Sequence, residues 1–189
     1  MSNDNSQDYS TPKIKIVVLG ESKVGKSALI FRYLKGKFPK EHDPTVEDTY
    51  KVEKEDLKYD LQILDTAGEK DYQSAIENWI NDGNCFILVY SIDDENSFKE
   101  LDAKYEKICQ IKKKEAFSII LVGNKCDLEN ERKVTEQEGK KYAEKKNMLF
   151  LEASALEIIN VKEVFDTVLD NYLKKNGEIK EEKSWCPCF

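Results

Sequence analysis

Residues 20–27 read Gly20-Glu21-Ser22-Lys23-Val24-Gly25-Lys26-Ser27, and this stretch decides the fold. It follows an apolar run at 13–19 and precedes a helical pattern at 27–35. Glycines let the backbone curl so that N–H groups point at phosphate oxygens, and the helix N-terminus adds a favourable dipole. Lys26 is then expected to reach the β- and γ-phosphates and the Ser27 hydroxyl to ligate Mg²⁺. The strand–loop–helix context argues against an ordinary glycine turn with a chance lysine.

Apolar runs alternate with helical patterns along the rest of the chain. Strands are expected at 13–19, 50–52, 59–64, 84–91, 117–122 and 148–151, and helices at 27–35, 98–108, 134–145 and 161–173. A charged hairpin at 53–58 would join the second and third strands. The sequence therefore predicts an α/β fold, a P-loop NTPase with a mixed, mostly parallel six-stranded sheet and helices on both faces.

The predicted domain organisation is simple. One domain is expected at residues 13–173, preceded by a polar leader at 1–12 that we expect to be disordered and followed by a charged tail at 174–189.

A second motif, Asp65-Thr66-Ala67-Gly68, follows the third expected strand. A carboxylate at such a position is costly unless it serves a purpose, and a magnesium ion held through water would be one. The Gly68 backbone N–H could then approach the γ-phosphate. Taken alone, Asp65 could simply cap the following turn.

Two later loops predict which base is bound. In the first, Asn124-Lys125-Cys126-Asp127, the carboxylate could accept N–H bonds from guanine N1 and N2, a pair of donors that adenine lacks. The stem of Lys125 could cover the base, and Asn124 could tie this loop to residues 20–27. In the second, residues 152–156, the Ala155 N–H would contact guanine O6, although alone this segment indicates only a loop.

Composition narrows the function further. The 189 residues carry a net charge of −7, which argues against nucleic acid as a partner because phosphate neutralisation needs a basic face. No apolar run approaches the roughly 18 residues that span a bilayer. Five cysteines and a polar N-terminus are typical of a reducing compartment rather than of a disulfide framework.

With these motifs in this order, residues 13–173 resemble the Ras superfamily of small GTPases, and residues 42–50 are similar to the effector loop of its Ras and Rap branch. The resemblance implies a small G domain that binds GTP or GDP with Mg²⁺ and hydrolyses GTP slowly. It implies that Thr45 ligates Mg²⁺ and contacts the γ-phosphate, so that losing this phosphate releases the loop. Phe38 would pack edge-on against the guanine.

The site residues predicted in this way form three sets. The nucleotide would be contacted by Gly20, Glu21, Ser22, Lys23, Val24, Gly25, Lys26, Ser27, Ala28, Phe38, Thr45, Asp65, Gly68, Asn124, Lys125, Asp127, Ser154, Ala155 and Leu156. The metal would be held by Ser27, by Thr45 and, through water, by Asp65. The catalytic residues would be Lys26, Gly68 and Glu69.

Several positions depart from the family pattern. Glu69 stands where glutamine is usual; when ionised it offers only acceptors and would face the γ-phosphate charge. It could take a proton from water, be protonated itself because its pKa is raised, or be an exposed charge without a role. Ser22 and Lys23 replace two small glycines and narrow the entry for an arginine finger. Lys23 could add charge near the phosphates or point into solvent, and His42 is more typical of a switch-loop side chain than of a catalyst.

The chain ends Trp185-Cys186-Pro187-Cys188-Phe189, which is similar to a lipidation signal. Cys186 is the expected prenylation site, and the terminal phenylalanine favours geranylgeranyl. Pro187 is unusual and could hinder processing; Cys188 would be removed with the last three residues or would remain as a second candidate. Four lysines against three glutamates at 174–183 give little basic support, so we expect weak anchoring at the cytoplasmic face of a membrane, the plasma membrane first. An unmodified tail is the alternative.

Three functions compete. The first is a signalling switch that is loaded by a guanine-nucleotide exchange factor, turned off with a GTPase-activating protein, and read by an effector with a Ras-binding-type domain. Glu47 and Asp48 would face that effector, unless they are only a solvated strand edge. The second is a hydrolysis-impaired, mainly GTP-bound effector-binding module, which Glu69 and residues 22–23 favour. A P-loop small-molecule kinase is third, and the guanine-type loop argues against it.

Overall fold

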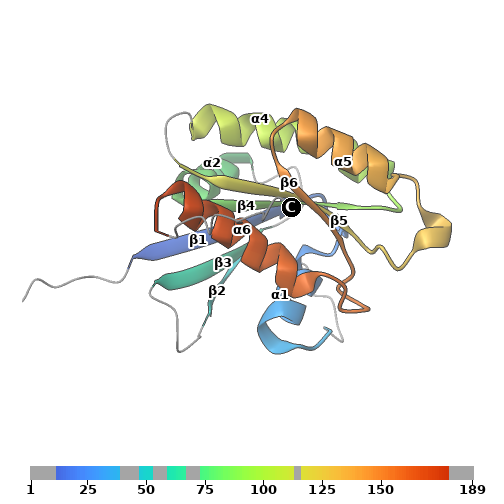
Figure 1. Cartoon of the computed structure of the whole chain (residues 1–189), viewed down its shortest axis with the longest axis horizontal. Helices are drawn as coiled ribbons and strands as arrows, with labels where there is room; N and C mark the ends of the chain where they lie inside the picture. The colour runs from blue at the N-terminus through green and yellow to red at the C-terminus, as the bar shows by residue number, and fades with distance from the viewer. Residues whose placement is uncertain (1–11, 39–46, 53–58, 67–72, 113–115, 179–189) are drawn as a thin grey trace, which may run out of the picture.

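A six-stranded sheet forms the centre of the chain in the computed structural model, which describes residues 12–38, 47–52, 59–66, 73–112 and 116–178 (Figure 1). The strands are β1 (Lys13–Gly20), β2 (Glu47–Val52), β3 (Asp60–Thr66), β4 (Cys85–Ser91), β5 (Ser118–Asn124) and β6 (Leu149–Ala153). The helices are α1 (Lys26–Lys35), α2 (Gln73–Asp82), α3 (Glu95–Lys99), α4 (Leu101–Ile111), α5 (Glu136–Lys145) and α6 (Val161–Lys175), with a 3₁₀ turn η2 at Glu129–Glu131.

The strand order is β2-β3-β1-β4-β5-β6. Strands β2 and β3 are antiparallel, and every other neighbouring pair is parallel. Both β4 and β5 are buried along their whole length, as expected for strands that are covered on two faces. The predicted mixed, mostly parallel six-stranded sheet is confirmed.

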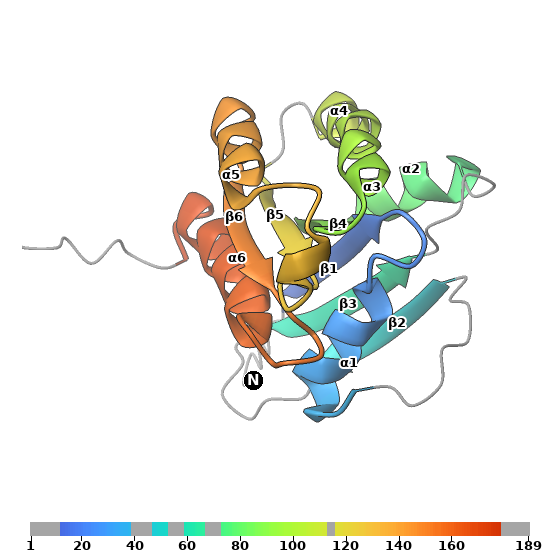
Figure 2. The same ribbon diagram turned by 90° about the vertical axis from the view of Figure 1, so that its right-hand side faces the viewer.

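Helices cover both faces of the sheet, and two separate cores result (Figure 2). Successive residues of β1 point to opposite sides: Ile16 and Val18 pack with α1 and α6, whereas Val17 and Leu19 pack with α2, α4 and α5. This alternation fixes β1 between the two layers. Its last residue, Gly20, therefore emerges at a defined edge of the sheet.

Some element boundaries differ from the sequence prediction. Helix α2 was not predicted, because only Ala75, Ile76, Trp79 and Ile80 form its apolar stripe among polar neighbours. The helix expected at 98–108 is in fact two helices, and the side chain of Asp94 caps the first of them. Helix α5 begins at 136 rather than 134 since the preceding threonine forms a capping box.

The last two strands run further than predicted. β5 and β6 continue two residues beyond 122 and 151, because Gly123 pairs with Glu152 and Asn124 with Ala153. The expected hairpin at 53–58, most of the leader and the lipidation signal lie outside the described residues.

The carboxyl ends of the parallel strands all lie at one edge of the sheet, where α/β proteins of this kind bind ligands. This edge carries residues 20–27 after β1, the loop after β5 and the loop after β6. Within the described part of the chain, none of the helices is both long and apolar enough for a membrane span.

Candidate functional site

The loop between β1 and α1 forms a turn that only glycine can complete. Gly25 has a φ of +93°, and a Cβ there would lie 2.4 Å from Nδ2 of Asn124. Lys23 is also left-handed, with a φ of +65°. Gly25, the residue before α1, has no side chain that could cap the start of the helix. A curled backbone at an uncapped helix N-terminus suits an anion such as a phosphate chain.

Lys26 lies inside this loop rather than in solvent. Its side chain is 7% exposed, and Nζ donates to the carbonyl oxygens of Gly20 at 3.1 Å and Glu21 at 3.0 Å. Burial lowers the pKa of Lys26 to about 8, while the charge of Asp65 raises it and that of Lys104 lowers it. The loop thus holds a desolvated cation where the motif predicts one.

The candidate metal ligands lie beside it. Asp65 is 1% exposed near the end of β3, and its neighbour Thr66 donates to the Val18 carbonyl at 2.7 Å. A buried carboxylate next to the Lys26 ammonium, with the Ser27 hydroxyl at the start of α1, is an oxygen set that suits Mg²⁺ better than a softer metal.

These residues therefore fit the groups that the motifs imply. Mg²⁺ would be held by Ser27 and, through water, by Asp65, and it would neutralise charge on the β- and γ-phosphates. The remaining predicted residues here, Thr45, Gly68 and Glu69, lie outside the described residues, as does His42.

The loop after β5 is tied to residues 20–27, which we call the phosphate loop. Nδ2 of Asn124 donates to the Val24 carbonyl at 2.7 Å, and Asn124 is 1% exposed. This is the tie that the sequence predicted. Because buried amide groups are expensive to leave unpaired, the bond fixes the spacing between the two loops.

Asp127, the predicted guanine acceptor, is positioned by the loop after β6. Ser154 is fully buried, and its hydroxyl donates to Oδ1 of Asp127 at 2.5 Å. The backbone N–H of Cys126 also donates to the Ala153 carbonyl at 3.1 Å. The end of β6 thus holds both the Asp127 carboxylate and the backbone of its loop, and the carboxylate has capacity left to accept further N–H bonds.

Lys125 is held by a residue that sequence reasoning missed. Its backbone is left-handed, with a φ of +62°, and Nζ lies 3.7 Å from Oδ1 of Asp93. Burial raises the pKa of Asp93, but the hydrogen bond from Ser91 and the charge of Lys125 outweigh it, so the pKa is lowered overall. An ionised Asp93 can therefore orient the lysine stem that was predicted to cover the base.

Arg32 on α1 is a second residue that was missed. Nε donates to the Ala155 carbonyl at 2.8 Å and Nη2 to the Leu156 carbonyl at 3.0 Å. Its guanidinium carbon lies 5.8 Å from the ring centre of Phe38, which is 43% exposed. Arg32 thus contacts both Phe38, which was predicted to pack against the guanine, and the loop predicted to bind guanine O6. The sequence gives no signal for this role, because the residue is an ordinary arginine in a helical pattern.

The remaining predicted contacts are peripheral. Ser22 and Lys23 are exposed, and Ala28 is half-buried against the core of α1 and α6. The exposure of Lys23 agrees with the alternative in which its side chain points into solvent.

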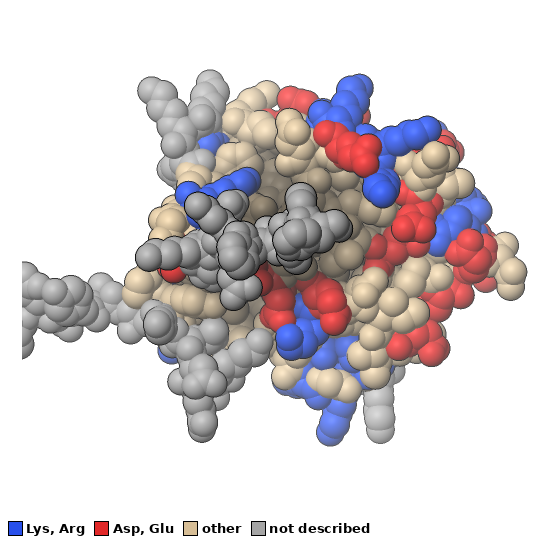
Figure 3. Space-filling view, in the orientation of Figure 1, with Lys and Arg blue, Asp and Glu red and all other residues tan. Residues whose placement is uncertain are grey.

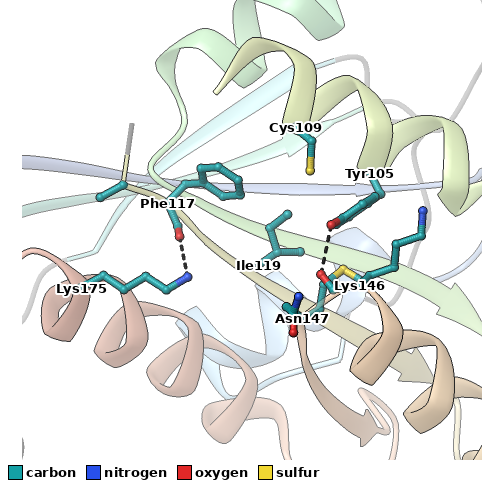
Figure 4. A pocket seen from close by; sticks show the side chains of 9 residues that line it. Tyr105, Cys109, Phe117, Ile119, Lys146, Asn147 and Lys175 are labelled. Carbon is teal, nitrogen blue, oxygen red and sulfur yellow. Dashed lines mark hydrogen bonds between the residues drawn. The ribbon is translucent and has the colours of Figure 1, made fainter. Parts of the chain in front are cut away.

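A separate cavity of about 350 Å³ lies away from this edge (Figure 4). Tyr105, Phe117, Ile119, Lys146 and Lys175 are among the residues that line it. Because Phe117 directly precedes β5, the cavity opens at the amino ends of the strands. It is therefore distinct from the candidate nucleotide site.

Surface charge is mixed on the face shown in Figure 3. Acidic and basic side chains lie side by side at its upper right, over α5.

Comparison with known proteins agrees with the geometry. A family model described as the Ras family matches residues 15–174. The chain is 43% identical over 157 residues to Ras-like protein 1 of Saccharomyces cerevisiae, an alignment that covers 82% of this chain and 51% of that protein. It is 41% identical over 175 residues to Ras-like protein rasB of Dictyostelium discoideum, covering 89% of this chain and 88% of that protein. The chain thus spans about half the length of the yeast relative and most of the other.

Proposed function

Because the chain belongs to the Ras family of small GTPases, we propose that it is a signalling switch that binds GTP or GDP with Mg²⁺ and hydrolyses GTP slowly. One observation carries the proposal: the Asn124–Val24 hydrogen bond joins a phosphate-type loop to a guanine-type loop. A small-molecule kinase that binds ATP would have no use for an Asp127 that Ser154 holds in place, because adenine lacks the N1–H and N2–H donors of guanine.

Hydrolysis in this proposal depends mainly on positioning and charge. Lys26 and the N–H groups of the phosphate loop bind the oxygens on which negative charge develops, and the Gly68 N–H approaches the γ-phosphate. Glu69 orients the attacking water as an acceptor, a poorer arrangement than the donor and acceptor that glutamine supplies. Slow intrinsic turnover follows from this difference.

Effectors with a Ras-binding-type domain would bind residues 42–50 while GTP is present. Strand β2 is the edge strand of the sheet, and Asp48 on it is exposed. An edge strand with an acidic side chain offers both backbone groups and charge to a basic partner. An exchange factor and a GTPase-activating protein would complete the cycle; Ser22 and Lys23 would restrict the entry of the latter's arginine finger.

A membrane anchor is the last part of the proposal. Prenylation of Cys186 would hold the chain at the cytoplasmic face of a membrane, with the plasma membrane as the first candidate. A single lipid with few basic residues beside it gives reversible binding. Incubation with a protein prenyltransferase and the labelled isoprenoid tests this proposal. Label should be incorporated, geranylgeranyl ahead of farnesyl, and should be lost in Cys186→Ser.

Single-turnover hydrolysis of preloaded GTP, with Glu69→Gln beside the wild type, tests the switch. A measurable wild-type rate below that of the glutamine variant is expected, whereas a rate at or above that of the variant would show that Glu69 activates the water better than glutamine does. A rate near zero that glutamine restores would instead favour the second function, a mainly GTP-bound effector-binding module. Preference for adenine over guanine nucleotides would contradict both and revive the kinase hypothesis.

A further inference from the structure

An ion pair links the phosphate loop to helix α4. Nζ of Lys104 on α4 donates to Oε1 of Glu21, the second residue of the loop. The two residues are 83 positions apart in the chain. Neither the loop motif nor the helical pattern of α4 predicts this contact.

The pair is better shielded from solvent than an ordinary surface salt bridge. The Lys104 and Glu21 side chains are 17% and 21% exposed, whereas those of Glu95 and Lys99 in α3 are 57% and 62% exposed. Shielded pairs are screened less by salt and by water. The charge of Lys104 should therefore act on its surroundings.

Lys104 also stands where a cation is disfavoured on local grounds. It is the fourth residue of α4, in the first turn, where the helix dipole favours negative charge. The contact with Glu21, rather than the stability of the helix, therefore explains why a lysine occupies this position.

The pair lies next to the central cation of the proposed site. The backbone carbonyl of Glu21 accepts from Lys26 Nζ at 3.0 Å, while its side chain accepts from Lys104. The charges of both Lys104 and Glu21 act on Lys26. Glu21 would otherwise bring an uncompensated carboxylate beside the binding place of a triphosphate.

We propose that Lys104 is a positioning residue for the phosphate loop, which draws the Glu21 carboxylate toward α4 and neutralises it, and thereby favours binding of GTP. This inference rests on the proposed function, since it assigns a role in nucleotide binding. Lys104 touches neither nucleotide nor metal in this role. It acts through Glu21.

Affinities of the full-length chain for GTP and GDP, measured with fluorescent analogues in Mg²⁺ buffer, test this role. Lys104→Met should weaken GTP binding on the order of tenfold and GDP binding by less, because GTP carries more negative charge toward the unpaired Glu21. Glu21→Gln in the same chain should restore most of the loss. Lys104→Arg keeps the charge and should bind GTP like the wild type. Added KCl should shrink the Lys104→Met deficit.

Lys107→Gln is the matched control. Lys107 lies one turn further along α4 and pairs with Glu77, with side chains that are 37% and 55% exposed. The Lys107→Gln substitution should leave the affinities for GTP and GDP unchanged. If Lys104→Met binds GTP with the same affinity as Lys107→Gln, the inference is overturned. A deficit that Glu21→Gln does not rescue would overturn it too, because that result indicates lost packing rather than an unpaired charge.

Glu21→Gln alone gives a test that does not require the Lys104→Met variant to fold correctly. It leaves the Lys104 charge uncompensated near the loop, so GTP affinity should rise a few-fold, and a fall contradicts the proposal. Wild-type protein that binds no guanine nucleotide would refute the proposed function itself, and the inference with it. Wild-type binding with equal affinities across all Lys104 variants would refute the inference alone.

Discussion

Raising the pH above 8 should weaken nucleotide binding, because the nucleotide-free chain then loses a proton from Lys26. This side chain is 7% exposed, and burial lowers its pKa from 10.5 to about 8. A bound phosphate chain supplies opposite charge and raises the pKa again. Binding at pH values above 8 must therefore return a proton to Lys26.

The magnitude follows from the two pKa values. With a pKa of about 8 in the free chain and at least the ordinary value in the complex, the dissociation constant should rise about tenfold between pH 7 and pH 9. At pH 8.5 about 0.75 of a proton should be taken up per nucleotide bound, against about 0.1 at pH 7. Stability of the nucleotide-free chain should move in the opposite direction. The folded pKa lies below the unfolded one, so the cost of the buried charge is fully present below pH 8 and is relieved as the pH rises toward 10.5.

Isothermal titration calorimetry with GDP and Mg²⁺, in two buffers of different ionisation enthalpy at pH 7.0 and 8.5, measures this uptake. Lys26→Arg is the control, because a guanidinium stays protonated across this range. It should bind more weakly but without the extra proton at pH 8.5, and titration of the nucleotide itself cancels between the two proteins. Equal proton uptake by wild type and Lys26→Arg, or none by either, would refute the reasoning.

Two further predictions concern the loops that hold the base. Ser154→Ala removes the hydroxyl that donates to Asp127, which should cost about 0.5–1.5 kcal/mol and lower guanine-nucleotide affinity about two- to tenfold, measured by competition with a fluorescent analogue. An unchanged affinity would show that Asp127 is positioned without it. Asn124→Ala leaves the buried Val24 carbonyl without its donor, at about 1–3 kcal/mol, and should lower the Tm of the nucleotide-free chain by about 2–10 °C in scanning calorimetry. A Tm within 1 °C of wild type, roughly the spread of a neutral substitution, would contradict that cost.

Much of the fold could be predicted because the central strands are apolar without interruption. Strand β4 is buried at every position, and such a run between helical patterns permits few arrangements. Helix α2 could not be predicted so readily: its apolar stripe is short and lies among polar residues. The end of β5 was also missed, since pairing through Asn124 depends on a partner strand 29 residues away at Ala153 and not on local pattern.

The candidate site divides in the same way. Short motifs predicted the groups that are proposed to face a ligand, because phosphate, metal and base each demand particular atoms at fixed spacing. The side chains that support those groups could not be predicted from the sequence. Arg32, Asp93 and Lys104 act across more than 30 residues or between separate elements, and each is an ordinary charged residue in its own segment. Only the folded arrangement shows that they support the loops.

Gly25 and Asn124 show why two motifs 100 residues apart behave as one unit. A Cβ on Gly25 would lie 2.4 Å from the Asn124 amide nitrogen, the atom that donates to Val24. The glycine is therefore required twice, once for a left-handed backbone and once for the space that the amide occupies. A larger residue at 25 would strain the phosphate loop and at the same time displace the anchor of the base loop. If these loops bind phosphate and base as proposed, the buried Asn124–Val24 hydrogen bond would couple the two, and a change in either loop should be transmitted to the other.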